Sequence, residues 1–278
     1  MKILIIGLGS IAKKHIHALG EVVDDFKLYA LRSSANPDTY PGITNVTDAE
    51  GDYDYAIISS PSVNHLDDIK KLSNKHIPVM VEKPFLTSRE QIEEFKTITP
   101  TPNIYVACNM RFIPSFLQFV DRVYRDTSKV NEVTSYCGSY LPNWRATDYR
   151  DSYSAQSKLG GGVNLDLIHE FDLLYYMFGK PDNVIKRNKK YSTLELDTYD
   201  YSNYILEYKN FEATVKLNYF RRDYKRYIEV VKENRTYYWE LDKKEVSTSY
   251  VEQMRYFIES KKYTNDSKEA IEVLNIVL

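Results

Sequence analysis

Short, continuous apolar runs alternate with helix-like segments in the first part of the chain. Strands are predicted at residues 2–6, 26–31, 55–59, 78–81 and 104–108, and helices at 11–19, at 88–97 and from after residue 65 to about 74. Continuous runs of this length are typical of parallel strands that are covered on both faces. Strands that alternate with helices over short connections predict a right-handed, doubly wound parallel sheet. We therefore predict an α/β domain at residues 1–111.

The second part of the chain changes to alternating apolar and polar positions. Strands are predicted at residues 130–140, 183–191, 201–208, 213–219, 227–231 and 236–241, and helices at 112–126, 163–178, 250–261 and 268–277. A period of two indicates half-buried strands, as in an antiparallel sheet with one covered face. We predict an α+β domain at residues 112–278, with a mostly antiparallel sheet and the 163–178 helix against one face.

Composition excludes several classes of protein. The chain has 278 residues, 43% of them hydrophobic and 27% charged, and a net charge of −2, so no overall field favours nucleic acid or a membrane surface. The first residues enter a strand without a signal-peptide pattern and no apolar segment is long enough to span a membrane, so we expect a cytoplasmic protein. The two cysteines, Cys108 and Cys137, are too few for a disulfide framework or a cysteine metal site, and we predict no metal.

A glycine-rich turn follows the first strand directly. Gly7, Gly9 and Ala12 match the dinucleotide fingerprint G-x-G-x-x-A. Gly7 permits the tight turn, Gly9 allows a pyrophosphate to approach the backbone, and Ala12 lets the helix pack on the strand. Ser10 and Ile11 open that helix, whose N–H groups and dipole favour phosphate. The alternative is a plain glycine-rich connection.

The second strand ends at a basic residue rather than an acidic one. Arg32, Ser33 and Ser34 stand where an NAD-binding fold carries the acid that binds the ribose hydroxyls. An arginine with two hydroxyls suits a 2′-phosphate, which favours NADP over NAD. The alternative is a solvated Arg32 in a protein that binds NAD.

Two later strand ends carry further polar residues. Ser60 and Pro61 are expected beside the nicotinamide half of the cofactor, and His65 is either a ribose contact or a structural, helix-capping residue. Glu82 and Lys83 follow the strand that ends at Val81. A lysine fixed there can donate a proton or hold a charged oxygen, whereas the alternative is a surface Glu–Lys pair.

The predicted 163–178 helix carries three polar residues among apolar ones. Asp166, His169 and Asp172 have the spacing i, i+3 and i+6, which places them near one helical face. A histidine beside a carboxylate is the usual pair for moving a proton near neutral pH. The alternative is a core histidine held by a carboxylate, and we expect Asp172 to be structural.

The irregular stretch at residues 141–159 precedes this helix. Loops this long in a compact domain are usually functional or disordered. Its aromatic and charged residues predict a polar, sugar-sized pocket that binds an anionic group: Trp144, Arg145, Tyr149, Arg150 and Tyr153. The alternative is a surface loop packed by its own aromatic residues.

Taken together, these motifs resemble those of the glucose-fructose oxidoreductase / inositol dehydrogenase / MocA family. The matching features are Gly7–Ala12, Ser60-Pro61 with His65, Glu82-Lys83-Pro84, Asn109-Met-Arg111-Phe, and Gly160-Gly-Gly162 with His169-Glu-Phe-Asp172. They occur in the family order between positions 7 and 172. The stretch from Leu141 to Gly162 is similar to that of members associated with bacterial surface-sugar synthesis.

The resemblance implies a nicotinamide-dependent oxidoreductase that acts on a carbohydrate-like hydroxyl or ketone. It implies that Lys83, His169 and Asp166 are catalytic, that Glu82, Asn109 and Arg111 contact the cofactor, and that the Lys83–Pro84 bond is cis. Many members space the helical Asp and His by four residues, whereas here the spacing is three, so His169 carries over more safely than Asp166. The outer face of the second sheet is where members form oligomers, which predicts a homo-dimer or tetramer.

Three hypotheses for the function follow. The first is hydride transfer between NADP, or NAD, and a sugar or nucleotide sugar. The second is a regulatory protein of the same fold that senses cofactor or sugar without catalysis, against which the presence of both Lys83 and His169 argues. The third is an α/β sugar-binding scaffold that binds no dinucleotide.

Overall fold

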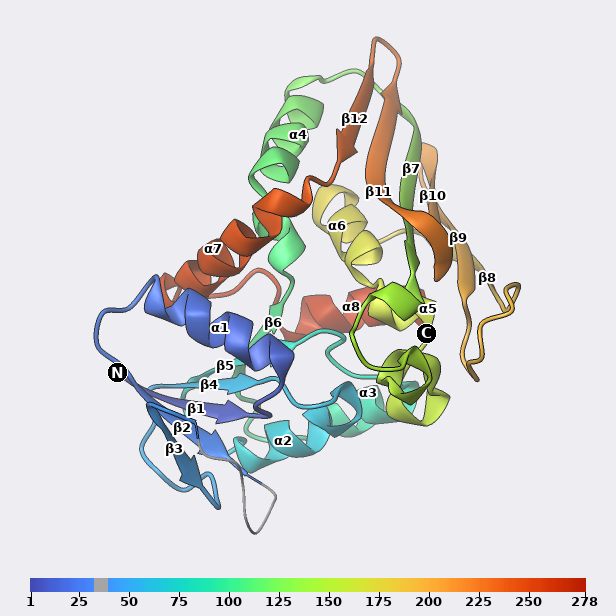
Figure 1. Cartoon of the computed structure of the whole chain (residues 1–278). Coiled ribbons are helices and arrows are strands. Elements are labelled where there is room, and N and C mark those ends of the chain that lie inside the picture. Colours follow the sequence, from blue (N-terminus) through green and yellow to red (C-terminus); the bar gives the residue numbers. More distant parts are fainter. Residues whose placement is uncertain (33–39) are drawn as a thin grey trace. The chain divides into compact units, whose positions relative to one another are not determined.

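Two six-stranded sheets form the framework of the described residues, 1–32 and 40–278, in this computed structural model (Figure 1). The chain divides into two units, each built on one sheet. The first unit comprises residues 1–109 and 250–274 with residue 278, and the second comprises residues 110–249 and 275–277.

The sheet of the first unit is entirely parallel. Its strands are β1 (Lys2–Ile6), β2 (Lys27–Leu31), β3 (Ile43–Val46), β4 (Tyr55–Ile58), β5 (Pro78–Glu82) and β6 (Asn103–Ala107). The order β3-β2-β1-β4-β5-β6 reverses the direction of winding between β1 and β4, which is where open α/β sheets bind ligands. This confirms the predicted doubly wound sheet. The sequence did not predict β3, because this short edge strand has only two apolar residues and neither is fully buried.

Three helices cover this sheet from two sides. They are α1 (Ser10–Gly20), α2 (His65–Lys71) and α3 (Arg89–Phe95). Figure 1 shows α1 on one face and α2 and α3 on the other. Ser88 caps α3 by accepting a hydrogen bond from the N–H of Gln91 at 3.3 Å.

The last two helices of the chain, α7 (Val246–Glu259) and α8 (Ser267–Val277), return largely to the first unit. The Tyr55 hydroxyl donates to the carbonyl of Ile258 at 3.0 Å, and the ring of Phe257 packs against Tyr55 and Tyr105 at centroid distances of 5.4 and 6.0 Å. The sequence assigned both helices to the second domain. Helical periodicity shows that a face is buried but not which sheet buries it.

The sheet of the second unit is antiparallel except for one pair of strands. Its strands are β7 (Val130–Tyr140), β8 (Asn183–Lys189), β9 (Tyr201–Tyr208), β10 (Phe211–Asn218), β11 (Phe220–Lys232) and β12 (Thr236–Glu240). In the order β12-β11-β7-β10-β9-β8, only β7 and β10 run parallel, which confirms the predicted mostly antiparallel sheet. β11 begins seven residues earlier than predicted, because residues 220–226 are largely charged and the register with β7 shifts among them.

The predicted 163–178 helix is two helices. α5 spans Val163–Asp166 and α6 spans His169–Phe178, with a break at Leu167, where φ is −97° and ψ is 34°. Leu167 and Ile168 are both buried apolar residues, so the apolar pattern continues across the break and the sequence does not indicate it. Asp166 is therefore not on the same helix as His169, and the predicted shared helical face is wrong for this residue. Together with α4 (Pro114–Arg125), α6 lies against one side of the sheet in Figure 1.

The helices of the described residues are short. The longest, α7, has 14 residues, whereas a membrane-spanning helix needs about 20. None of the helices in residues 1–32 and 40–278 is both long and apolar enough to cross a membrane.

Candidate functional site

The glycine turn between β1 and α1 combines a backbone constraint with open space. Gly7 has φ +88°, and a Cβ atom there would lie 2.3 Å from the backbone nitrogen of Ser60. A Cβ atom on Gly9 would meet nothing within 4 Å. The first residue fixes how the turn passes the end of β4, and the second leaves room beside the N-terminus of α1. This helix has no side-chain cap on its first N–H groups, which include those of Ser10 and Ile11.

A cavity of about 740 Å³ opens beside this turn, at the carboxyl ends of β1, β2 and β4. Four of the predicted cofactor residues line it: Gly7, Arg32, Ser60 and Pro61. The sequence did not predict the polar residues that complete the wall, which are Thr47, Asp48, Glu50, Asn64, Asp67, Asp68 and Lys71. The first three follow β3, the strand that was missed, and the others lie on and before α2. The volume is in the range of small-molecule sites.

Two cations flank the Tyr40 ring, Arg32 at the end of β2 and Lys13 on α1. The guanidinium of Arg32 is 5.8 Å from the centre of the Tyr40 ring, and the ammonium of Lys13 is 5.7 Å from the same ring. Nη1 of Arg32 is buried and has no hydrogen-bond partner among the described residues. A buried guanidinium nitrogen of this kind is suited to an anionic ligand. Ser33 and Ser34, predicted beside it, fall outside the described residues.

Glu82 is held by two hydrogen bonds at the end of β5. Nε2 of the buried His15 lies 2.6 Å from Oε1, and the backbone N–H of Lys83 donates to Oε2 at 3.1 Å. Burial alone would raise the pKa of this carboxyl, but the hydrogen bond and charge of His15, together with Lys83, hold the pKa below its ordinary value. Glu82 is thus a carboxylate at neutral pH. The Lys83–Pro84 bond is cis, as the resemblance implied.

His65 is not among the residues that line the cavity. Its side chain is fully buried; Nδ1 faces the carbonyls of Pro84 and Phe85 at 3.1 and 3.2 Å, and Nε2 faces that of Ser60 at 3.0 Å. Burial lowers the pKa of His65, and the hydrogen bonds to these carbonyls oppose only part of that effect. The geometry supports the structural alternative for this residue and does not show the predicted cofactor contact.

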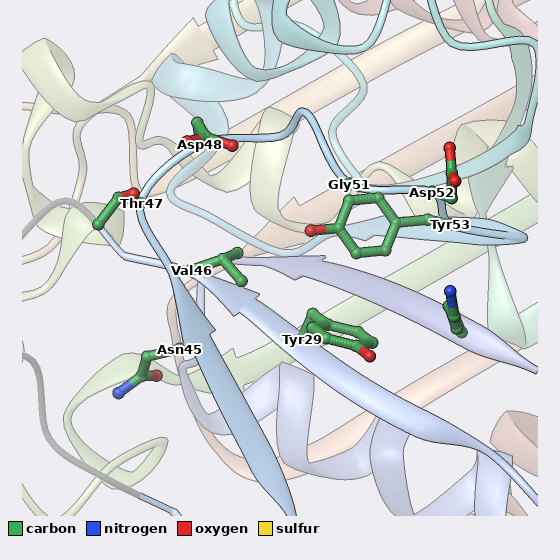
Figure 2. Close-up of a pocket in the computed structure, with 9 residues that line it drawn as sticks. Tyr29, Asn45, Val46, Thr47, Asp48, Gly51, Asp52 and Tyr53 are labelled. Carbon is green, nitrogen blue, oxygen red and sulfur yellow. The ribbon is translucent and has the colours of Figure 1, made fainter.

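A second hollow, of about 510 Å³, lies on the face of the sheet beside β2 and β3 (Figure 2). The rings of Tyr29 and Tyr53 meet edge to face across it, with centroids 5.4 Å apart. Thr47 and Asp48 line both this hollow and the larger cavity, so the loop after β3 forms a wall of each. The hollow contains none of the residues that the sequence proposed for the site.

Asn109 and Arg111 fall in different units. Asn109 is buried at the end of the first unit, whereas Arg111 lies in the second and makes a bidentate ion pair with Asp172, at 2.8 and 2.6 Å. The guanidinium also lies 5.2 Å from the centre of the Tyr176 ring. These contacts fix Arg111 to α6, and its contact with the cofactor stays a prediction. They agree with the structural role expected of Asp172.

Four predicted substrate residues of the second unit cluster around Tyr219, a residue that the sequence did not predict. The hydroxyl of Tyr219 donates to Oδ2 of Asp166 at 2.5 Å, and Trp144 meets the Tyr219 ring edge to face at 5.4 Å. The guanidinium of Arg145 lies 5.0 Å from the Tyr153 ring, and burial, followed by the charge of Asp166, raises the pKa of Tyr153. Burial, and then the charge of Asp166, hold the pKa of Tyr219 well above its ordinary value, so this phenol remains a donor.

Tyr149 and Arg150 lie elsewhere in the same loop. Arg150 is exposed and pairs with Asp148 at 2.5 Å and with Glu195 at 3.4 Å. The Tyr149 hydroxyl accepts a hydrogen bond from the N–H of Glu195 at 3.0 Å. Both residues fasten one surface turn to another. The structure therefore supports the surface-loop alternative for these two residues and not the predicted substrate contact.

His169 is the first residue of α6 and is nearly buried, with 9% of its surface exposed. Two buried ion pairs hold the same helical turn. Glu170 pairs with Arg226 of β11 at 2.6 Å, and Asp172 pairs with Arg111. Carboxylates are favoured in the first turn of a helix, where the positive end of its dipole lies. Two ion pairs therefore fix the helical turn that carries the imidazole of His169.

Comparison with protein families identifies both parts of the chain. Residues 1–107 match a family described as oxidoreductases with an NAD-binding Rossmann fold, and residues 126–238 match the GFO/IDH/MocA C-terminal domain. The rhizopine catabolism protein MocA of Rhizobium meliloti is 22% identical over 188 residues, which are 63% of this chain and 56% of that protein. The match thus spans little more than half of that relative's length.

Solved structures share the whole fold. Myo-inositol 2-dehydrogenase from Lactobacillus plantarum superposes with a TM-score of 0.84 at 17% identity, covering 100% of this chain and 95% of that one. The WlbA dehydrogenase from Thermus thermophilus, solved with NAD and alpha-ketoglutarate, gives a TM-score of 0.78 at 20% identity, covering 100% and 93%. At these identities the comparison establishes the fold.

Proposed function

The chain belongs to the Gfo/Idh/MocA family of oxidoreductases, and from that premise we propose that it is a dehydrogenase or reductase acting on a CH–OH group of a sugar or related polyol. The observation that carries the proposal is the cofactor cradle of the first unit. There, the open space over Gly9, the uncapped N-terminus of α1 and the 740 Å³ cavity meet at the switch point of a parallel sheet.

The cofactor is proposed to be NADP. Gly7, Gly9, Ser10 and Ile11 would hold the pyrophosphate, and Arg32 with Lys13 would hold the 2′-phosphate, because both cations flank Tyr40. NAD is the alternative, since Asp48 and Glu50 line the same cavity and a carboxylate is the group that binds an unmodified ribose. The structure of the WlbA dehydrogenase was solved with NAD.

Three side chains carry the proposed chemistry. When bound, the nicotinamide exchanges hydride with the substrate carbon. The Lys83 ammonium, at the end of β5, donates a hydrogen bond to the reacting oxygen and stabilises the charge that develops on it. His169 takes or gives the hydroxyl proton, for which an imidazole is suited near neutral pH. Asp166, whose side chain is oriented by Tyr219, is proposed to accept hydrogen bonds from substrate hydroxyls.

The substrate is proposed to be a sugar that carries an anionic group, such as a nucleotide sugar. The cluster around Tyr219 offers aromatic faces from Trp144 and Tyr153 and a carboxylate from Asp166, which are the groups that bind sugar rings and hydroxyls. Arg145 adds an exposed cation at the edge of this cluster. It would pair with a carboxylate or phosphate of the substrate.

The protein is also proposed to form a cytoplasmic homo-oligomer through the outer face of the second sheet. One row across this face runs through Ile185, Ile205, Thr214, Thr134, Glu229 and Tyr238. Ile185 and Tyr238, at its two ends, are 51% and 45% exposed. A sheet face with polar residues at its centre and apolar side chains at both ends is suited to a symmetric interface between two copies of the chain.

A panel of sugars, inositols and nucleotide sugars, assayed with NADP⁺ and NAD⁺, tests the activity. Lys83→Ala should lower kcat on the order of a thousandfold, with NADPH affinity by fluorescence titration nearly unchanged. Lys96→Ala is the control, because Lys96 is an exposed partner of Glu93. Wild-type turnover by Lys83→Ala would refute the role of this residue. NADPH binding without turnover of any compound would favour the regulatory alternative, and no NADPH binding would favour the sugar-binding scaffold.

The proposed joint action of Lys83 and His169 has its own test. If Lys83 and His169 serve the same step, the double variant Lys83→Ala/His169→Ala should lose little more activity than the worse single variant. Losses that multiply would show that the two residues act independently.

A further inference from the structure

Two fully buried histidines contact the residues directly before and after Lys83 in the chain, and the proposed chemistry uses neither. His15 is on α1, and His65 is the first residue of α2; the side chain of each has no solvent exposure. A residue placed there for packing alone would be apolar, because burying an imidazole costs free energy unless it is hydrogen-bonded. The hydrogen bonds of the two rings therefore indicate their purpose.

His15 acts on the residue before Lys83. Its Nε2 lies 2.6 Å from one oxygen of Glu82, and the other oxygen accepts the backbone N–H of Lys83 at 3.1 Å. Nδ1 has no hydrogen-bond partner among the described residues, so the ring's polar attachment is Glu82. The edge of the Tyr250 ring closes its other side, at a centroid distance of 5.9 Å. The carboxylate is thus a bridge from α1 to the backbone of the lysine.

His65 acts on the residues after Lys83. Nδ1 faces the carbonyls of Pro84 and Phe85, and Nε2 faces the carbonyl of Ser60. Ser60 lines the cofactor cavity, and its hydroxyl donates to Asp68 of α2 at 2.6 Å. A neutral imidazole carries one N–H, so the ring donates either to the segment that follows the lysine or to the carbonyl of Ser60, and it packs between the two.

We propose that His15 and His65 are positioning residues that hold Lys83 in register with the cofactor cavity. This proposal rests on the role proposed above for Lys83. One ring fixes the backbone on the amino side of the lysine, through Glu82, and the other fixes it on the carboxyl side. Displacement of a reacting group by about 1 Å costs on the order of a hundredfold in rate. Two rigid attachments within the buried part of the unit prevent such a displacement.

Amide hydrogen exchange across residues 82–87 measures, without any substrate, whether the two histidines hold the backbone around Lys83. His15→Phe fills the space of the ring but cannot bond Glu82, so the amide of Lys83 should exchange about tenfold faster or more. His15→Gln, which can still donate to the carboxylate, should remain within about twofold of wild type. His65→Phe should accelerate exchange in the same segment. His17→Phe and His76→Phe are matched controls, because both histidines are exposed.

Kinetics then separate positioning from general stability. With the best substrate from the panel, His15→Phe should lower kcat on the order of tenfold or more in the wild-type background and less than about twofold in Lys83→Ala. An equal loss in both backgrounds, or unchanged exchange in His15→Phe, would overturn the proposal. Should His15→Phe fail to fold, Glu82→Gln tests the same contact and should also accelerate exchange.

The two proposals fail in different ways. If the wild-type protein neither binds NADPH nor turns over any compound, the proposed function fails, and the exchange experiment still decides whether the histidines hold the backbone of Lys83. If the protein is active and exchange in His15→Phe and His65→Phe equals that of wild type, the positioning role alone is refuted.

Discussion

The two units differ in how they assemble their candidate residues. In the first unit, residues from three strand ends and from the Gly7 turn surround one cavity, although they lie up to 54 positions apart in the chain. In the second unit, one loop of predicted substrate residues divides, so that Trp144 and Arg145 join the cluster around Tyr219 while Arg150 pairs with Glu195. Parallel strands bring their carboxyl ends together whatever the side chains are. The path of a loop depends on partners that lie far away in the chain.

The largest effect is expected from the buried ion pair of the second unit. Asp172→Ala removes the carboxylate that pairs with Arg111 and leaves a buried guanidinium without it, so the free energy of unfolding should fall by about 3–5 kcal/mol. Urea denaturation measures the change. Asp121→Ala, which removes the partner of the exposed Arg125, should cost less than about 0.5 kcal/mol. Equal costs for the two variants would show that Asp172 does not support α6.

Substitutions at Gly7 and Gly9 should separate an effect on folding from an effect on cofactor binding. Gly7→Ala places a Cβ atom against the backbone of Ser60 at a positive φ, so it should destabilise the protein by about 2–4 kcal/mol. Gly9→Ala meets no atom, so its thermal denaturation should match wild type, while NADPH affinity falls on the order of tenfold because the Cβ atom occupies the space kept for the pyrophosphate. Unchanged NADPH affinity in Gly9→Ala would contradict the cradle.

The smallest effect concerns the choice of cofactor. Arg32→Ala should lower the ratio of NADPH to NADH affinity about tenfold, or ~1.4 kcal/mol, through the loss of charge-assisted hydrogen bonds to the 2′-phosphate. Lys71→Ala is a control, since Lys71 also lines the cavity but pairs with Asp68 at 2.6 Å. A ratio that stays the same in Arg32→Ala would point to NAD as the cofactor.

Residue periodicity was sufficient to predict both sheets, because parallel and antiparallel strands differ in their apolar patterns. The glycine turn and the class of protein were also predicted, from short motifs with a characteristic spacing and order along the chain, and the family resemblance implied the cis bond at Lys83–Pro84. Each of these features depends on residues that are close together in the sequence.

The features that were missed depend on distant partners. β3 and the acidic loop that follows it have no strong local pattern, so the wall formed by Asp48 and Glu50 was not found. Tyr219 is one of 25 tyrosines, and only its contact with Asp166 distinguishes it. Similarly, the apolar pattern passes through the break at Leu167 and gave no sign that Asp166 and His169 lie on separate helices.

The return of residues 250–274 to the first unit bears on synthesis at the ribosome. Phe257 packs against Tyr55 and Tyr105, so we expect the first unit to complete its packing only after residues 250–274 have been translated. The strands of the second sheet leave the ribosome before α7, which packs on the first sheet, has been synthesised. A fragment cut after residue 111 would leave these rings in water, and we expect it to aggregate when produced alone.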